Sequence, residues 1–89
     1  MNDADRFRKE FSEAQIAVKS GDYKTAFKKF EHLAEQGIAS AQYCLAVMHH
    51  NGQGTKQDSK KAATLYSDAA TQGMIQAINQ LGIMCSKGD

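Results

Sequence analysis

The sequence repeats itself at an interval of 36 residues, and this period restricts the fold more than any other feature. When the chain is aligned with itself at that offset, ten pairs of identical residues coincide, among them Ala26/Ala62, Leu45/Leu81 and Gly37/Gly73. A repeat of this length is one supersecondary unit that buries its apolar side by stacking on the next unit. The period therefore predicts a stack of similar units rather than one mixed core.

The spacing of apolar residues inside each unit is helical. Ala26, Phe30 and Leu33 recur at intervals of four and three, which places them on one face of a helix, and Ala62 and Tyr66 repeat the pattern. No alternating pattern of useful length indicates a strand. The sequence predicts an all-α fold, a short α-solenoid of helix-pair repeats. Its five helices are expected at residues 3–19, 22–36, 40–50, 58–72 and 75–87.

Helix boundaries are marked by residues with defined end preferences. Asp22 and Asp58 precede two of the predicted helices, and aspartate is a preferred N-cap. Gly37 and Gly73 follow the same helices, at the position where glycine adopts the left-handed conformation that ends a helix. These signals support the predicted helix pairs.

Composition and charge limit the class of partner. The chain has 89 residues, no proline, and eleven Lys and Arg against ten Asp and Glu, for a net charge of +1. This length supports one small domain. Near-neutral, interspersed charge is poorly suited to binding a phosphate backbone, so we expect no nucleic-acid partner.

The hydropathy pattern predicts no membrane segment. The longest apolar run has five residues, from Cys44 to Met48, against the roughly 20 that a spanning helix needs. The first fifteen residues are charged throughout and do not resemble a signal peptide. If Met1 is the true start, we expect a cytoplasmic protein with free thiols, although a trimmed secreted protein would look the same.

Residues 39–73 closely resemble a Sel1-like repeat, a relative of the tetratricopeptide repeats. The resemblance rests on the spacing of Ala41, Leu45 and Tyr66, and on the glycine-rich loop at 51–54. Residues 3–37 resemble a tetratricopeptide-type helix pair with a short turn, and residues 75–88 resemble the first helix of a further unit. We therefore expect a single repeat domain over residues 1–89.

The resemblance implies a non-catalytic adaptor that binds another protein or a peptide. In such repeats the first helix of each pair lines a concave groove. Carried across by position, the groove would be lined by Phe11, Gln15, Tyr43, Val47, His50, Asn79 and Ile83. For each of these residues, ordinary packing inside the repeat is an equally open interpretation.

A second candidate surface lies on the last predicted helix. Its apolar residues, Ile75, Ile78, Leu81 and Met84, indicate an interface with a partner protein or with a second copy in a homodimer. Two alternatives stay open at this point. The helix can fold back and hide these residues, or the chain can be a fragment of a longer solenoid.

The sequence offers little for catalysis or for cofactors. His49 and His50 are neighbours that point about 100° apart on one helix, so they cannot share a metal ion. Cys44 and Cys85 occupy non-equivalent repeat positions, which argues against a disulfide between them. We predict no enzyme activity, metal or cofactor. The alternatives are an inhibitor or immunity-type protein that blocks a partner, or a metal- or thiol-dependent protein that uses these four residues.

Overall fold

Five helices account for most of the chain in the computed structural model, which describes residues 3–86. They are α1 (Asp3–Lys19), α2 (Tyr23–Glu35), α3 (Ala39–Asn51), α4 (Ser59–Thr71) and α5 (Ile75–Ser86). The described residues contain no strand. The predicted all-α class is confirmed, and each predicted helix boundary on the described residues lies within one residue of the observed one. The predicted end of the last helix, at residue 87, lies outside the described residues.

The helix ends use the residues that the sequence indicates. The Asp22 carboxylate accepts a hydrogen bond from the backbone N–H of Thr25 at 3.3 Å, and Asp58 accepts one from Lys61 at 3.1 Å. Each bond satisfies a backbone donor that the first turn of a helix leaves without a partner. Gly37, with φ of 83°, follows the C-cap of α2 in the left-handed region. The predicted caps are therefore confirmed.

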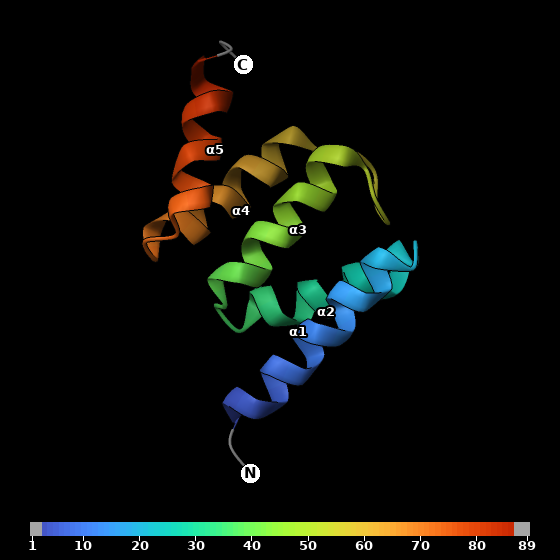
Figure 1. Ribbon diagram of the computed structural model, residues 1–89. Coiled ribbons are helices and arrows are strands. Elements are labelled where there is room, and N and C mark those ends of the chain that lie inside the picture. The colour runs from blue at the N-terminus through green and yellow to red at the C-terminus, as the bar shows by residue number, and fades with distance from the viewer. Residues whose placement is uncertain (1–2, 87–89) are drawn as a thin grey trace.

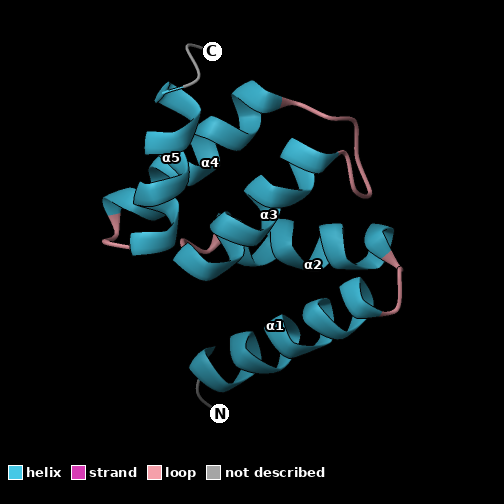
Figure 2. Cartoon of the chain, turned by 45° about the horizontal axis from the view of Figure 1, so that its top comes forward, coloured by secondary structure: helices cyan, strands magenta, loops and turns pink. Residues whose placement is uncertain are grey.

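The helices stack in sequence order, each packing on the one before and the one after it (Figure 1). The described chain ends lie at opposite ends of the stack, with α1 at one end and α5 at the other (Figure 2). The molecule measures 44 × 27 × 17 Å along its principal axes. These proportions suit a solenoid, in which each unit contacts only its neighbours.

Two core clusters meet at α3. The first joins α1, α2 and α3 around Phe30 and Leu33, and the second joins α3, α4 and α5 around Tyr66. Alanines at the crossings, such as Ala41 and Ala46, are fully buried and let the helices approach closely. Because α3 contributes to both clusters, it is the central helix of the fold.

Two aromatic pairs show how α1 corresponds to α3. Phe11 of α1 packs edge-to-face on Phe30 of α2, and Tyr43 of α3 packs edge-to-face on Tyr66 of α4, both at 5.5 Å between ring centroids. Phe30 and Tyr66 are 36 positions apart, whereas Phe11 and Tyr43 are 32 apart. The difference arises because the 52–58 loop is four residues longer than the 20–22 turn.

Candidate protein-binding groove

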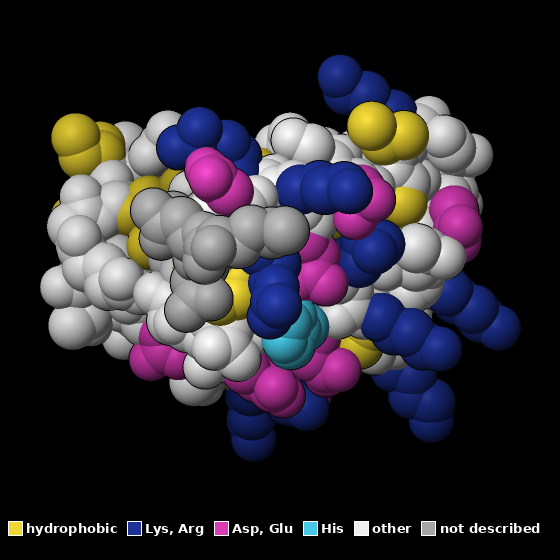
Figure 3. Space-filling model, turned by 90° about the horizontal axis from the view of Figure 1, so that it is seen from below, with side chains coloured by type: hydrophobic (Ala, Val, Ile, Leu, Met, Phe, Trp, Pro, Cys, Tyr) yellow, Lys and Arg dark blue, Asp and Glu magenta, His cyan; other side chains and the backbone are white. Residues whose placement is uncertain are grey.

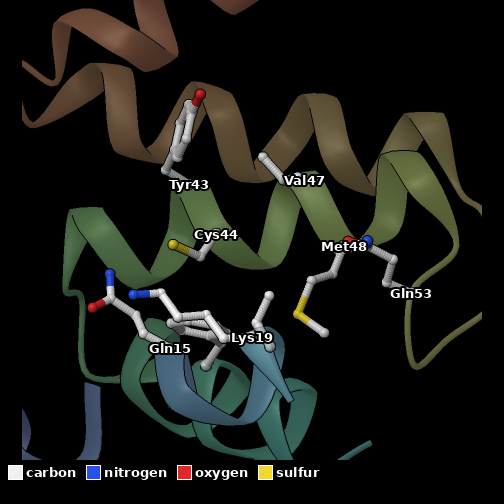
Figure 4. Close-up of a pocket in the computed structure, with 9 residues that line it drawn as sticks. Gln15, Lys19, Tyr43, Cys44, Val47, Met48 and Gln53 are labelled. Atoms are coloured by element: carbon white, nitrogen blue, oxygen red, sulfur yellow. The ribbon is translucent and has the colours of Figure 1, made fainter. Parts of the chain in front are cut away.

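A pocket of about 380 Å³ lies between α1 and α3, the first helices of the first two pairs. Figure 4 shows Cys44 and Met48 pointing from α3 toward α1, while Tyr43 and Val47 point toward α4. The complete lining is Gln15, Val18 and Lys19 of α1, Phe30 of α2, Tyr43, Cys44, Val47 and Met48 of α3, and Gln53 of the following loop. This volume falls in the range of about 300–1,000 Å³ that is usual for ligand pockets.

The pocket lies where α1 and α3 both pack extensively on α2 and less extensively on each other. The extensive helix contacts in the described chain are between consecutive helices. Phe30, which is only 2% exposed, rises from α2 and forms the floor of the pocket. The short side chain of Cys44 faces the gap from α3 and leaves part of it open.

The chemistry of the pocket is apolar inside and polar at its edge. Val18, Cys44 and Val47 are half-buried and form the walls. Gln15 and Lys19 are exposed and supply hydrogen-bond donors beside the opening. An apolar interior with a polar rim is the usual anatomy of a surface that receives side chains of another protein.

The structure brings three of the seven predicted groove residues together. Gln15, Tyr43 and Val47 line the pocket. Phe11 packs on Phe30 instead and does not line it, because its ring completes the aromatic pair between α1 and α2. The side chain of His50 lies outside the lining, although it is half-buried.

The other two predicted groove residues lie on α5, away from the pocket. Asn79 and Ile83 are both exposed. They occupy the repeat positions of Tyr43 and Val47, but the pocket between α1 and α3 does not extend to them. Equivalent positions in a repeat therefore do not meet in one continuous cavity in this molecule.

Sequence reasoning missed six of the lining residues. They are Val18, Lys19, Phe30, Cys44, Met48 and Gln53. Val18 could have been predicted from the sequence. The 32-residue offset between α1 and α3 places Val18 at the position of His50, which was itself a predicted groove residue. The others depend on how far apart α1 and α3 stand, which no local pattern encodes.

The predicted patch on α5 is divided between two sides of the helix. Ile75 and Ile78 are 69% and 49% exposed. Leu81 instead packs against the second core cluster, because it follows the buried Ala77 by four residues and shares its face. The side chain of Met84 lies outside the described residues.

The thiol of Cys44 is poorly suited to nucleophilic chemistry. Burial raises its pKa to about 11, so the group stays protonated at neutral pH. The thiolate is the reactive form of cysteine, and a raised pKa makes it scarce. Cys44 is a free thiol, and the side chain of Cys85 lies outside the described residues.

The histidines do not assemble a metal site in the part of the chain that the structure describes. Among the side chains that the structure describes, no three of His, Cys, Asp or Glu lie close enough together to hold a metal ion. His49 is 5% exposed and packs edge-to-face on Phe27 at 5.3 Å. His32 is partly exposed, and its Nδ1 lies 2.8 Å from Glu10 on α1.

Charged side chains of both signs are interspersed over the surface. Figure 3 shows lysine and arginine side chains lying among acidic ones on the face seen from below. One such contact joins Lys29 of α2 to Glu13 of α1 at 3.5 Å. Exposed pairs of this kind contribute little to stability.

None of the described helices is both long and apolar enough to span a bilayer.

Comparison with known proteins shows that part of the chain matches a known repeat family. Residues 39–74 match the family model of the Sel1 repeat. The match covers α3, the glycine-rich loop and α4, and it includes the wall of the pocket that α3 supplies. The resemblance predicted from residues 39–73 is confirmed.

Three relatives are similar to parts of the chain. An exopolysaccharide production negative regulator of Rhizobium leguminosarum bv. viciae is 34% identical over 58 residues, which are 65% of this chain and 22% of that protein. The DAP3-binding cell death enhancer 1 of Rattus norvegicus is 41% identical over 45 residues, which are 51% of this chain and 9% of that protein. An uncharacterized protein of Neisseria meningitidis serogroup B is 37% identical over 60 residues, covering 67% of this chain and 13% of that protein. The chain thus spans less than a quarter of each relative.

Proposed function

We propose that this chain, in which residues 39–74 match the Sel1 repeat, is a non-catalytic module that binds another protein through the pocket between α1 and α3. Sel1 repeats generally mediate protein–protein interaction. One relative, the DAP3-binding cell death enhancer 1, is named as a protein that binds another protein. The observation that carries the proposal is the apolar pocket itself. It opens between the first helices of two successive pairs and has polar side chains at its edge.

The pocket suits an apolar side chain of a partner, presented on an extended or looped segment. Phe30 and Met48 at its base are 2% and 3% exposed, so a side chain that enters displaces water from an apolar surface. Gln15 and Gln53 can hydrogen-bond the partner's backbone beside it, because an amide both donates and accepts. A few such buried anchors usually carry most of the binding energy of an interface.

The test separates the pocket from the rest of the surface. The full chain serves as bait in a quantitative pull-down, and each captured protein is then purified and titrated directly against it. Gln15→Trp fills the opening of the pocket from an exposed position, and Tyr43→Ala removes part of its wall. We expect each change to weaken the binding of the purified partner at least about tenfold.

The matched control is Ser67→Trp, which adds the same ring at an exposed position on α4 and outside the pocket. This variant should bind the partner as the unchanged chain does. Circular dichroism of all three variants checks that helicity is preserved. Full binding by both Gln15→Trp and Tyr43→Ala, with helicity intact, would show that the pocket is not the binding site.

Self-association through α5 is a separate prediction of the sequence. Light scattering after size exclusion, at two protein concentrations, measures it directly.

A further inference from the structure

Two carboxylates of α1 lie on the side of the helix that faces away from the pocket. Glu10 lies 2.8 Å from His32 of α2. Glu13 lies 3.5 Å from Lys29 of the same helix. Gln15 marks the pocket side of α1. At about 100° per residue, Glu10 and Glu13 lie about 140° and 160° around the helix from Gln15, so both are engaged elsewhere.

Two basic side chains of α1 lie on its pocket side and have no acidic partner in the described chain. Lys19 lines the pocket one turn after Gln15, and Arg8 lies two turns before Gln15 on the same side of the helix. Both side chains are exposed, and neither forms a salt bridge with a described residue. This includes Asp5, one turn before Arg8. A carboxylate from another molecule can therefore approach either cation without displacing an internal one.

The pocket itself carries one formal charge, which is positive. Lys19 is the only charged residue among the nine described residues that line it. The opposite wall comes from α3, whose residues Ala39–Asn51 include no Asp, Glu, Lys or Arg. Figure 4 shows Lys19 and Gln15 at the α1 edge of the pocket, with Cys44 facing them from α3. An ammonium beside apolar walls attracts a carboxylate more strongly than one in open water does.

The base of the pocket favours an aromatic side chain as the group that enters it. Phe30 contributes its ring and Met48 contributes its thioether. Figure 4 shows the Met48 sulfur on the side of α3 that faces α1. Aromatic rings pack favourably edge-to-face on other rings and against thioether sulfur. An aromatic anchor therefore gains from both residues.

The distance between the two cations sets the distance between the acidic groups that they would bind. Arg8 lies eleven residues before Lys19, and this separation is about 16 Å along the helix axis. An extended segment covers the same distance in about five residues. Because Lys19 lies at the pocket, one carboxylate falls next to the anchor and the other falls beyond it, toward Arg8.

We propose that the pocket receives an aromatic side chain from an acidic segment of a partner protein, with one carboxylate beside Lys19 and a second, about five residues away, beside Arg8. This inference rests on the proposed function and adds the chemistry of the partner to it. Complementary charges along an interface set its register and speed association. The carboxylates of the segment therefore orient it along α1.

Titration of the full chain with short peptides, followed by NMR, tests the charge pattern and measures weak binding. The acidic peptide has the core Glu-Phe-Ser-Gly-Ser-Glu and is used in both sequence directions. A second pair of peptides carries lysine in place of each glutamate, and a third carries serine in place of phenylalanine. We expect the acidic peptide, in at least one direction, to bind at least about tenfold more tightly than the other two kinds. Its affinity should fall about threefold between about 50 mM and 200 mM salt.

Substitutions of single charges locate the effect. Lys19→Glu should reverse the preference, so that the lysine peptide binds more tightly than the acidic one. Lys19→Gln should reduce the preference without reversing it. Lys60→Glu makes the same change in net charge at an exposed position on α4 outside the pocket, and it should keep the preference of the unchanged chain. Circular dichroism checks that each variant keeps its helicity.

Three outcomes would overturn the inference. The acidic and lysine peptides bind alike, no peptide binds, or Lys60→Glu alters the preference as much as Lys19→Glu does. The proposed function has its own separate readout, because Gln15→Trp should block a purified partner whatever the charge of its bound segment. A partner that Gln15→Trp blocks and Lys19→Glu leaves unaffected would therefore support the pocket and contradict the acidic segment.

Discussion

At the scale of single residues, His49 is one of two histidines in the described chain, with His50, whose Nδ1 is buried without a hydrogen-bond partner. His49 is 5% exposed. Burial is the largest influence that lowers its pKa from the usual 6.5, and the charge of Lys61 acts in the same direction. Asp58 and Glu31 oppose both influences but do not cancel them. The folded protein therefore holds His49 in its neutral form.

This preference predicts that stability falls as the pH is lowered through the ordinary histidine range. In the unfolded chain His49 takes up a proton near its usual pKa of 6.5, whereas the folded chain resists that proton. The unfolded state then binds more protons, so protonation favours unfolding below about pH 6.5 and has no effect well above it. Urea unfolding of the chain and of His49→Gln, from about pH 7.5 to about pH 5.5, measures the effect.

The difference between the two proteins isolates His49 from the other titrating groups. The unchanged chain should lose more stability over this range than His49→Gln does. His32→Gln is the matched control, since His32 lies on the surface beside Glu10 and should leave the His49 contribution in place. Parallel pH profiles for the unchanged chain and His49→Gln would contradict the prediction.

At the scale of elements, the loop between α3 and α4 is a packed part of the structure. The backbone N–H of Asp58 donates to the carbonyl of His49 at 2.8 Å, and the Gln57 side chain donates to the carbonyl of His50 at 2.8 Å. Gly54, with φ of 74°, lies against the first residue of α2. A Cβ at this position would come within 2.5 Å of the Tyr23 carbonyl oxygen.

We predict that Gly54→Ala destabilises the protein by about 2 kcal/mol or more. The substitution combines a left-handed backbone that L-residues rarely adopt with a clash against α2. Gly21→Ala is the matched control, because Gly21 has φ of 82° and open space around the added methyl group. Urea unfolding followed by circular dichroism should show a clearly smaller loss for Gly21→Ala. Equal losses would mean that the loop moves off α2 without cost.

The helices and their boundaries were predictable from the sequence, whereas the way the helices and loops pack on one another was not. Caps such as Asp58 and terminal glycines such as Gly73 encode helix boundaries locally, and they appear at both ends of the repeat. The repeat also places Tyr43 and Val47 on the correct face of α3. The contact of Gly54 with Tyr23, and the contribution of Phe30 to the pocket floor, depend on tertiary distances between elements. A pattern read within one helix carries no information about those distances.

At the scale of the whole molecule, stability should be distributed unevenly along the stack. α3 packs extensively on both α2 and α4, while α5 packs extensively only on α4 within the described chain. Solenoids gain their stability from interfaces between neighbours, so an end helix with one interface opens more readily than a central one with two. Native-state hydrogen exchange should therefore find the slowest amides in α3 and faster exchange in α5.

A substitution at one end tests whether these differences are local. Leu81→Ala removes side-chain packing between α5 and the second core cluster, and it should accelerate exchange in α5 by about tenfold. Amides of α1 should keep their rates, because α1 shares its extensive contacts only with α2. If the molecule instead unfolds as one cooperative unit, the slowest amides of α1 and α5 exchange with the same free energy, and Leu81→Ala lowers both equally. The pattern of exchange thus distinguishes a chain of coupled interfaces from a single core.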